Sequence, residues 1–157
     1  MERIQKYLNR VYRASILDRS EAFADKNLSG HQISYILLIC RHPGLTHDEL
    51  TKKLLVNKSS VSRTVNKMVK SGYIRRETDD QDRRSKRLYP TEKAKKLYPD
   101  VIKYLNDWNE ALTSNLSLHE QESLLYLLEH IAHAATERVS SKNLSCMLDA
   151  DLPEKGN

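Results

Sequence analysis

The chain has 157 residues, which is enough for one domain with a hydrophobic core and too few for two ordinary domains. Hydrophobic residues make up 39% of it and charged residues 30%, a balance that excludes a disordered chain. The longest apolar run covers residues 36–40, far below the ~20 residues of a membrane helix, and the N-terminus lacks the apolar stretch of a signal peptide. We therefore expect a cytoplasmic protein without a membrane segment.

The positive charge is concentrated in one part of the chain. Between Lys52 and Lys96 there are fifteen Lys and Arg residues against five Asp and Glu, a local charge of +10, while the whole chain carries +5. The remaining residues are therefore acidic on balance. A basic block inside an otherwise acidic chain is typical of a surface that contacts nucleic-acid phosphates.

Six helices are predicted in chain order, over residues 2–24, 30–41, 46–54, 58–71, 91–115 and 118–139. Three of their starts have the spacing of a capping box, in which a hydroxyl and a Glu or Gln three residues later satisfy each other's backbone amides. These pairs are Ser29 with Gln32, Thr46 with Glu49, and Ser117 with Glu120. Asn57 and Thr91 are further N-cap candidates. Pro99 is expected to kink the fifth helix or to start its second half.

The stretch between the fourth and fifth helices predicts a β-hairpin. Gly72 is a helix stop signal, and two short β-favouring runs, 73–78 and 85–89, enclose a charged loop over residues 79–84. The predicted fold is therefore mainly α, with six helices and a two-stranded β-wing. Residues 140–157 show no clear period, and we expect them to form a mobile tail.

Residues 46–72 have the pattern of a helix-turn-helix. Val61, Val65, Met68 and Val69 fall on one face of the second helix and should point into the core. The opposite face carries donors and cations, and no acidic residue occurs from Lys58 to Lys70. A DNA major groove admits a helix and offers hydrogen-bond acceptors on its base edges. We therefore predict DNA contacts by Lys58, Ser59, Ser60, Ser62, Arg63, Asn66 and Lys67.

The hairpin concentrates six more cations, Arg75, Arg76, Arg83, Arg84, Lys86 and Arg87. An arginine at a loop tip can enter the narrow minor groove, where the negative potential is concentrated. We predict DNA contacts by Arg83, Arg84 and Lys86, without separating the two arginines. Asp82 is assigned an orienting role, because a carboxylate can hold an adjacent guanidinium through paired hydrogen bonds.

The motifs of this region resemble a known family. They are Leu45-Thr46, Glu49-Leu50, Ser60 to Arg63, Met68 to Arg75, the Asp79 to Arg84 loop and Thr91 to Lys93. Over residues 45–97 they are similar to the winged helix-turn-helix of the MarR family of transcriptional regulators. The resemblance implies a homodimer that binds a palindromic operator in double-stranded DNA, usually as a repressor, often released by a small aromatic ligand or by oxidation. It implies one domain over 1–140, with dimerisation helices at 1–30 and 98–139 and a DNA-binding region at 31–97.

Dimerisation also has a basis in the residues. Three apolar stripes are more than a small winged domain can bury alone, and a two-fold helical interface would cover them. The stripes comprise Ile4, Tyr7, Leu8, Val11 and Tyr12, then Val101, Leu105, Trp108 and Leu112, then Leu124, Leu125, Leu128, Ile131 and Ala135.

Other functions of the same fold have weaker support. Cys40 lies on an apolar stripe and is expected to be a buried, inert thiol, whereas Cys146 in the tail could be reactive. His130 and His133, or His31 and His42, could serve a metal-responsive regulator, but no further ligands accompany them, so neither a metal nor a cofactor is expected.

Two functions outside DNA binding have less support in the sequence. The chain has no phosphate-binding loop and no nucleophile elbow, so we expect no enzymatic activity. A winged helix used for protein–protein contact would present an apolar or acidic helix face instead of a basic one. Eight tyrosines and one tryptophan could line a cleft for an aromatic effector, but no ligand-contacting residue is predicted.

Overall fold

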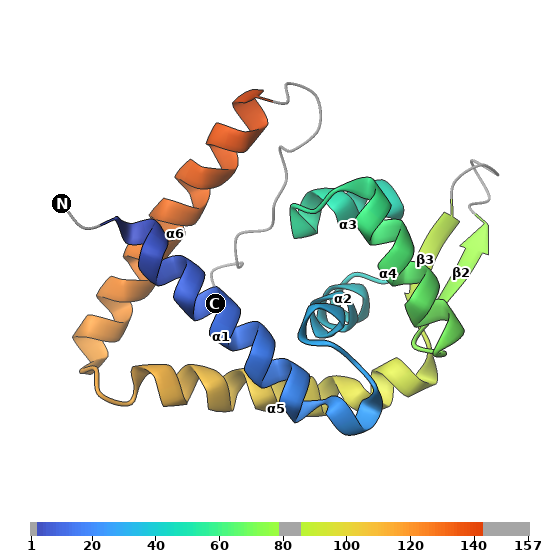
Figure 1. Ribbon diagram of the computed structural model, residues 1–157, viewed down its shortest axis with the longest axis horizontal. Helices are drawn as coiled ribbons and strands as arrows, with labels where there is room; N and C mark the ends of the chain where they lie inside the picture. The colour runs from blue at the N-terminus through green and yellow to red at the C-terminus, as the bar shows by residue number, and fades with distance from the viewer. Residues whose placement is uncertain (1–2, 79–85, 143–157) are drawn as a thin grey trace.

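The computed structural model describes residues 3–78 and 86–142. Within them the chain forms six α-helices, one short 3-10 helix and three strands (Figure 1). In chain order these are α1 (Ile4–Ala22), η1 (Ala24–Lys26), α2 (Gly30–Arg41), β1 (Leu45–Thr46), α3 (His47–Leu54), α4 (Lys58–Lys70), β2 (Ile74–Thr78), β3 (Lys86–Pro90), α5 (Glu92–Thr113) and α6 (Leu118–Lys142). The mainly helical fold with a β-wing is confirmed. The predicted tail, residues 140–157, lies almost wholly outside the described part of the chain.

The helix starts form as the capping patterns predict. Reciprocal hydrogen bonds join Ser29 with Gln32 before α2 and Thr46 with Glu49 before α3. Ser117 and Glu120 exchange the same pair of bonds at the start of α6. Each box satisfies backbone N–H groups that have no partner inside the helix, so the helix boundaries are set by local chemistry.

The sheet has one strand more than the sequence predicts. Its order is β1-β3-β2, and both pairings are antiparallel, with Leu45 opposite Leu88 and Arg76 also opposite Leu88 across the other edge. β1 contains only two residues and directly precedes the Thr46 capping box. Its pairing is with a strand forty residues away, which no local pattern reveals.

The core lies where α2, α3, α4, β3 and α5 meet. Its fully buried side chains include Ile33 and Ile36 of α2, Leu50 of α3, Val65 of α4 and Leu88 of β3. Because the helix-turn-helix and the sheet share this core, the outward face of α4 and the wing are held in one rigid arrangement.

Helix α5 corrects two expectations. It runs unbroken from Glu92 to Thr113, so Pro99 does not begin a second helix. Pro99 is exposed, and its missing N–H leaves the helix without one backbone hydrogen bond. Val101 is fully buried in the core and Leu105 packs against that core, so these two residues do not belong to a free dimerisation stripe. They face inward because α5 crosses beneath α2 along this turn.

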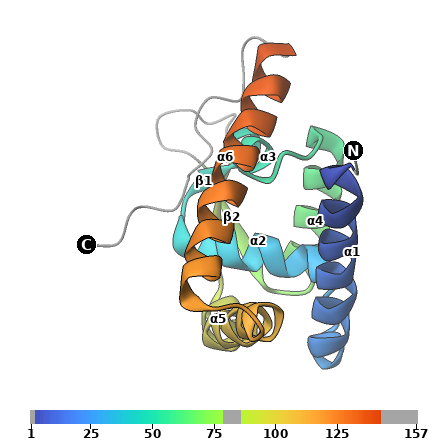
Figure 2. The same cartoon turned by 90° about the vertical axis from the view of Figure 1, so that its left-hand side faces the viewer.

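Helices α1 and α6 leave apolar side chains exposed. α6 begins at the end of α5 that is farthest from the wing and runs past the N-terminal part of α1 (Figures 1 and 2). No residue of α6 from 118 to 139 is buried. The exposed apolar side chains of these two helices include Ile4, Tyr7, Val11, Tyr12, Leu17, Leu124, Leu125, Tyr126, Leu127 and Leu128. Apolar surface of this extent is typical of an interface with another chain.

Candidate nucleic-acid interface

The turn between α3 and α4 fixes how the second helix is presented. Leu55 adopts a left-handed conformation, with φ at 51°, and its N–H donates to the Lys52 carbonyl at 3.2 Å. Two residues later the Asn57 side chain accepts from the Ser60 N–H at 2.8 Å and caps α4. A left-handed residue followed at once by an N-cap leaves the chain few alternative paths, so the angle between the helices is set locally.

Helix α4 has the two faces that its sequence predicts. Val61, Val65 and Met68 are fully buried, and Val69 is half-buried against the same core. The predicted contact residues Lys58, Ser59, Ser62, Arg63, Asn66 and Lys67 are all exposed, whereas Ser60 is half-buried. The structure therefore brings these polar side chains together on one accessible helix surface. We call this surface, Lys58 to Lys70 on the side away from the core, the α4 outer face.

One carboxylate approaches the α4 outer face from the neighbouring helix. Asp48 of α3 pairs with Lys58 at 2.7 Å, and this hydrogen bond lowers the pKa of the Asp48 carboxyl. Both side chains remain well exposed, so the pair contributes little to stability. It still positions the Lys58 ammonium beside the helix start. Along α4 itself Arg63 donates to the Ser60 hydroxyl at 3.3 Å.

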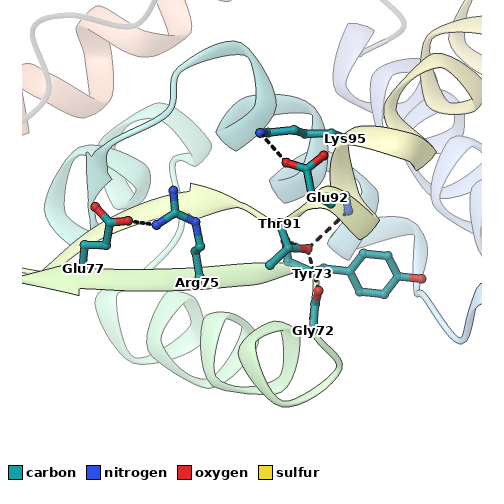
Figure 3. A network of polar contacts seen from close by, with 8 residues as sticks. Gly72, Tyr73, Arg75, Glu77, Thr91, Glu92 and Lys95 are labelled. Atoms are coloured by element: carbon teal, nitrogen blue, oxygen red, sulfur yellow. Dashed lines mark hydrogen bonds and ion pairs between the residues drawn. The ribbon is translucent and has the colours of Figure 1, made fainter.

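Hydrogen bonds connect the end of α4 to the first residues of the wing. Gly72 has φ at 77°, and the Tyr73 N–H donates back to the Met68 carbonyl at 2.9 Å, which closes the helix. The Thr91 hydroxyl donates to the Gly72 carbonyl at 2.6 Å while accepting from the Ala94 N–H at the start of α5. Figure 3 shows Thr91 at this junction, with Gly72 and Tyr73 on one side and the first turn of α5 on the other. The Thr91 side chain thus connects the end of α4, the beginning of the wing and the first turn of α5.

The cations of the wing have different surroundings. Arg75 pairs with Glu77, as Figure 3 shows, and lies over the Tyr89 ring at 4.8 Å. Arg87 is half-buried and donates to the Gly44 carbonyl at 3.0 Å, so it supports the β1–β3 pairing. Lys86 is exposed and donates to the Thr78 hydroxyl at 3.2 Å. Of the predicted wing contacts, Lys86 is therefore placed on the surface, and the remaining tip residues Asp82, Arg83 and Arg84 lie outside the described residues.

A cleft of about 580 Å³ opens beside the α4 outer face. It lies between α1, α2 and α4, and its lining includes Tyr12, His31, Tyr35, Thr64 and Lys67. Burial raises the pKa of the Tyr35 hydroxyl, which therefore stays protonated at neutral pH. The cleft combines aromatic rings with hydroxyl and imidazole groups, a lining that suits a small aromatic molecule carrying polar substituents.

The comparisons with known proteins agree with this geometry. The model of the MarR family matches residues 26–85, which contain the whole helix-turn-helix. The chain is 28% identical to a MarR transcriptional regulator from Methanosarcina mazei Go1, with a TM-score of 0.81 over 85% of this chain and 96% of that one. In sequence and in fold the chain is similar to proteins of the MarR family. This similarity supports a DNA-binding transcriptional regulator rather than an enzyme.

Two further proteins are similar to this chain. The HTH-type transcriptional regulator YybA of Bacillus subtilis strain 168 is 29% identical over 109 residues, which cover 69% of this chain and 73% of YybA. A putative MarR-family regulator from Listeria monocytogenes, solved in complex with a 26mer DNA, has a TM-score of 0.84 at 24% identity. That alignment covers 91% of this chain and 96% of the Listeria chain, and it shows the shared fold.

Cysteine and metal chemistry gain no support from the described residues. The Cys40 thiol is half-buried, and burial raises its pKa, so it is protonated and a poor nucleophile at neutral pH. Cys146 lies outside the described residues. His130 contacts the Tyr126 carbonyl and ring, and across residues 3–78 and 86–142 no three potential ligands cluster. In the same part of the chain, no helix has the length and apolarity needed to span a bilayer.

One residue of the interface was underestimated from the sequence. Arg76 was counted in the hairpin cluster but not among the predicted contacts, yet its guanidinium donates to the Asn66 side chain on the α4 outer face. The alternation of strand β2 contains a signal for this, because Ile74 is buried and Arg76 lies on the same side of the strand. The pattern alone could not name Asn66 as its partner, since the register between strand and helix depends on the Gly72 turn.

Proposed function

We propose that the chain acts as a homodimeric repressor that binds a palindromic operator and is regulated by a small ligand. The observation that carries the proposal is the α4 outer face, an exposed run of donors and cations without an acidic residue, beside a cationic wing. In the proposed complex α4 enters the major groove and the wing contacts the flanking backbone. Residues 31–97 would form the DNA-binding region of a domain spanning 1–140.

The proposed contacts combine two kinds of recognition. Ser59, Ser62, Arg63 and Asn66 lie on the part of the α4 outer face that would meet base edges. Lys58, Ser60, Lys67 and Lys86 would contact phosphates, and the sequence adds Arg83 and Arg84 at the wing tip, oriented by Asp82. Phosphate contacts position the protein, while base contacts supply the specificity.

The experiment that tests this proposal is selection of bound duplexes from a random pool, followed by sequencing. A two-fold dimer predicts an inverted repeat whose half-sites are about one helical turn, ~34 Å, apart. Recovery of a palindrome supports both DNA recognition and dimer symmetry. Failure to enrich any sequence from a purified, folded protein at low salt would contradict the proposal.

The proposed dimer would form through the exposed apolar side chains of α1 and α6. Val11 on α1 is 50% exposed and belongs to the predicted apolar stripe, whereas Leu17, 71% exposed, lies about 120° further round the helix and outside that stripe, although its side chain is also apolar. Val11→Glu is therefore expected to yield monomers that lose operator affinity. Leu17→Glu is the matched control and should remain dimeric. Light scattering measures the oligomeric state of both variants. A dimeric Val11→Glu protein would contradict this interface.

The proposed effector site is the cleft between α1, α2 and α4. Since the cleft is bounded by α4 on one side, a ligand seated there can change the position of the outer face that meets DNA. A thermal-shift screen of aromatic acids and phenols would find such a ligand by its stabilisation of the folded protein. The regulatory proposal requires that a stabilising compound also lowers operator affinity, and that Tyr12→Ala weakens both effects. A compound that stabilises the protein without any effect on DNA binding would contradict it.

A further inference from the structure

Arg76 and Asn66 connect the wing to the α4 outer face by a side-chain hydrogen bond. The Arg76 guanidinium of β2 donates to Oδ1 of Asn66, and both side chains are exposed. A guanidinium has only donors, so the Asn66 amide must turn its oxygen toward Arg76. Its Nδ2, with two N–H donors, is then directed away from the wing. The orientation of this amide is fixed by chemistry and does not depend on how its two ends are assigned.

Two further observations place Arg76 on the helix side of the wing. Strand alternation places it on the same side as the buried Ile74, toward α4. Its charge is close enough to His47 of α3 that, after burial of the ring, it is the next cause lowering the pKa of that imidazole. The neighbouring Arg75 belongs to the other side of the strand, where it pairs with Glu77 and lies over the Tyr89 ring. Two adjacent arginines of the same strand therefore have separate environments.

The occupied oxygen limits how Asn66 can recognise a base. An asparagine that reads adenine in the major groove does so with both ends of the amide, donating to N7 and accepting from the N6 amino group. The Arg76 guanidinium takes one of the two lone pairs of Oδ1 and turns that oxygen toward the wing, so the end of the amide that is left to face a base is the Nδ2 donor. Adenine, guanine and thymine all offer a major-groove acceptor to such a donor, whereas cytosine presents its N4 amino donor there.

We propose that Arg76 sets the base preference of Asn66, by occupying its carbonyl oxygen so that Asn66 recognises bases as a hydrogen-bond donor only. The inference rests on the proposed function, because it requires α4 to lie in the major groove. It assigns to a wing residue a role in specificity that is exercised through the recognition helix. Arg76 is thus a positioning residue for Asn66, in addition to any contact with phosphate.

The test is selection of duplexes from a random pool with a small set of variants. Asn66→Ala identifies the position that Asn66 reads, because the preference at one symmetric pair of positions becomes weaker. The wild-type protein should exclude cytosine there and accept the other three bases within a few-fold. Arg76→Met frees Oδ1, so this variant should select adenine at that position by roughly fivefold or more, the discrimination of a two-bond amide–adenine pair.

Three matched variants separate this effect from loss of charge or structure. Arg75→Met removes the same charge one residue away and should keep the wild-type preference, even where its affinity falls. Arg76→Lys retains a hydrogen-bond donor for Oδ1 and should also keep the wild-type base preference. The adenine preference of Arg76→Met should vanish in the double variant Asn66→Ala/Arg76→Met. Circular dichroism and thermal unfolding confirm that each variant is folded.

The outcomes distinguish this inference from the proposed function. A wild-type palindrome with an Asn66-dependent position that is strictly adenine would overturn the inference while leaving operator binding intact. An unchanged preference in folded Arg76→Met would do the same. If Arg76→Met does not fold, the wild-type and Asn66→Ala selections still decide, because the three-base tolerance is predicted for the native protein. Absence of any enriched sequence with wild-type protein would overturn both proposals.

Discussion

At the residue scale, two residues with a left-handed backbone conformation lie on either side of helix α4. Leu55 precedes α4 and Gly72 follows it, with φ at 51° and 77°. The glycine was predictable as a stop signal after a helical pattern. The leucine was not, because leucine has no preference for a left-handed conformation.

Gly72→Ala tests the conformational requirement alone. An added Cβ would meet nothing within 4 Å, so the variant should lose only the cost of a left-handed alanine, about 1–2 kcal/mol of unfolding free energy. Gly72→Asn should lose less, since asparagine tolerates this conformation. Urea unfolding of the wild type and the two variants gives the order of their unfolding free energies. An alanine variant as stable as the wild type would show that the turn does not require this conformation.

The capping carboxylate Glu49 makes stability depend on pH. Hydrogen bonding from the Thr46 backbone N–H, followed by the Thr46 hydroxyl, lowers the pKa of Glu49 below its ordinary 4.5. Because the folded pKa is the lower one, its contribution is present above pH ~4.5 and is lost as the pH falls through the folded value. The stability difference between wild type and Glu49→Gln should therefore shrink between pH 7 and pH 3. Denaturant unfolding at both pH values measures it, and a constant difference would contradict the assigned role.

At the element scale, most helices follow from local chemistry. Capping boxes and N-caps lie within one turn of the groups they satisfy, so Ser29, Thr46, Asn57, Thr91 and Ser117 predicted their helices correctly. Features that depend on distant residues were missed. Strand β1 forms only against β3, and Val101 is buried only because α5 crosses the core, whereas an apolar stripe gives no information about which partner covers it.

The crossing of α1 over α2 depends on the absence of a side chain at Gly30. A Cβ there would lie 2.3 Å from the Ile16 carbonyl oxygen, a backbone atom that cannot move without its helix. Gly30→Ala should therefore destabilise the fold by about 1–3 kcal/mol, the usual cost of overpacking. Removing the nearby hydroxyl in Ser20→Ala/Gly30→Ala should not restore stability, because the clash is with backbone. Restoration in this double variant, measured by thermal unfolding, would contradict the argument.

At the scale of the whole molecule, charge and apolar surface are segregated. The α4 outer face carries cations without an acidic residue and the wing carries further cations, while α1 and α6 expose most of the large apolar side chains. The charge distribution along the sequence predicted the first surface, because the basic block coincides with one structural region. The candidate contacts on α4 were placed as expected, but the link between Asn66 and Arg76 needed the three-dimensional register of strand and helix.

Operator affinity should fall steeply with salt, because a dimer that neutralises several phosphates releases their counterions on binding. With six or more phosphate contacts, the loss between 50 and 200 mM salt is about a thousandfold or more. Lys67→Ala should reduce the slope of log K against log salt, whereas Lys103→Ala on α5, where Lys103 pairs with Asp107, should not. Titrations at four salt concentrations give both slopes. A flat line would be inconsistent with phosphate recognition.

The α4 outer face is proposed to recognise DNA sequence, and a substitution of Arg63 on this face tests that proposal most directly. The decisive measurement is the ratio of affinities for the selected palindrome and for a shuffled duplex of equal composition, in wild type and in Arg63→Ala at one moderate salt concentration. The account predicts that the variant loses affinity for the palindrome by tenfold or more, while its affinity for the shuffled duplex changes far less. An unchanged ratio in the folded variant would contradict it.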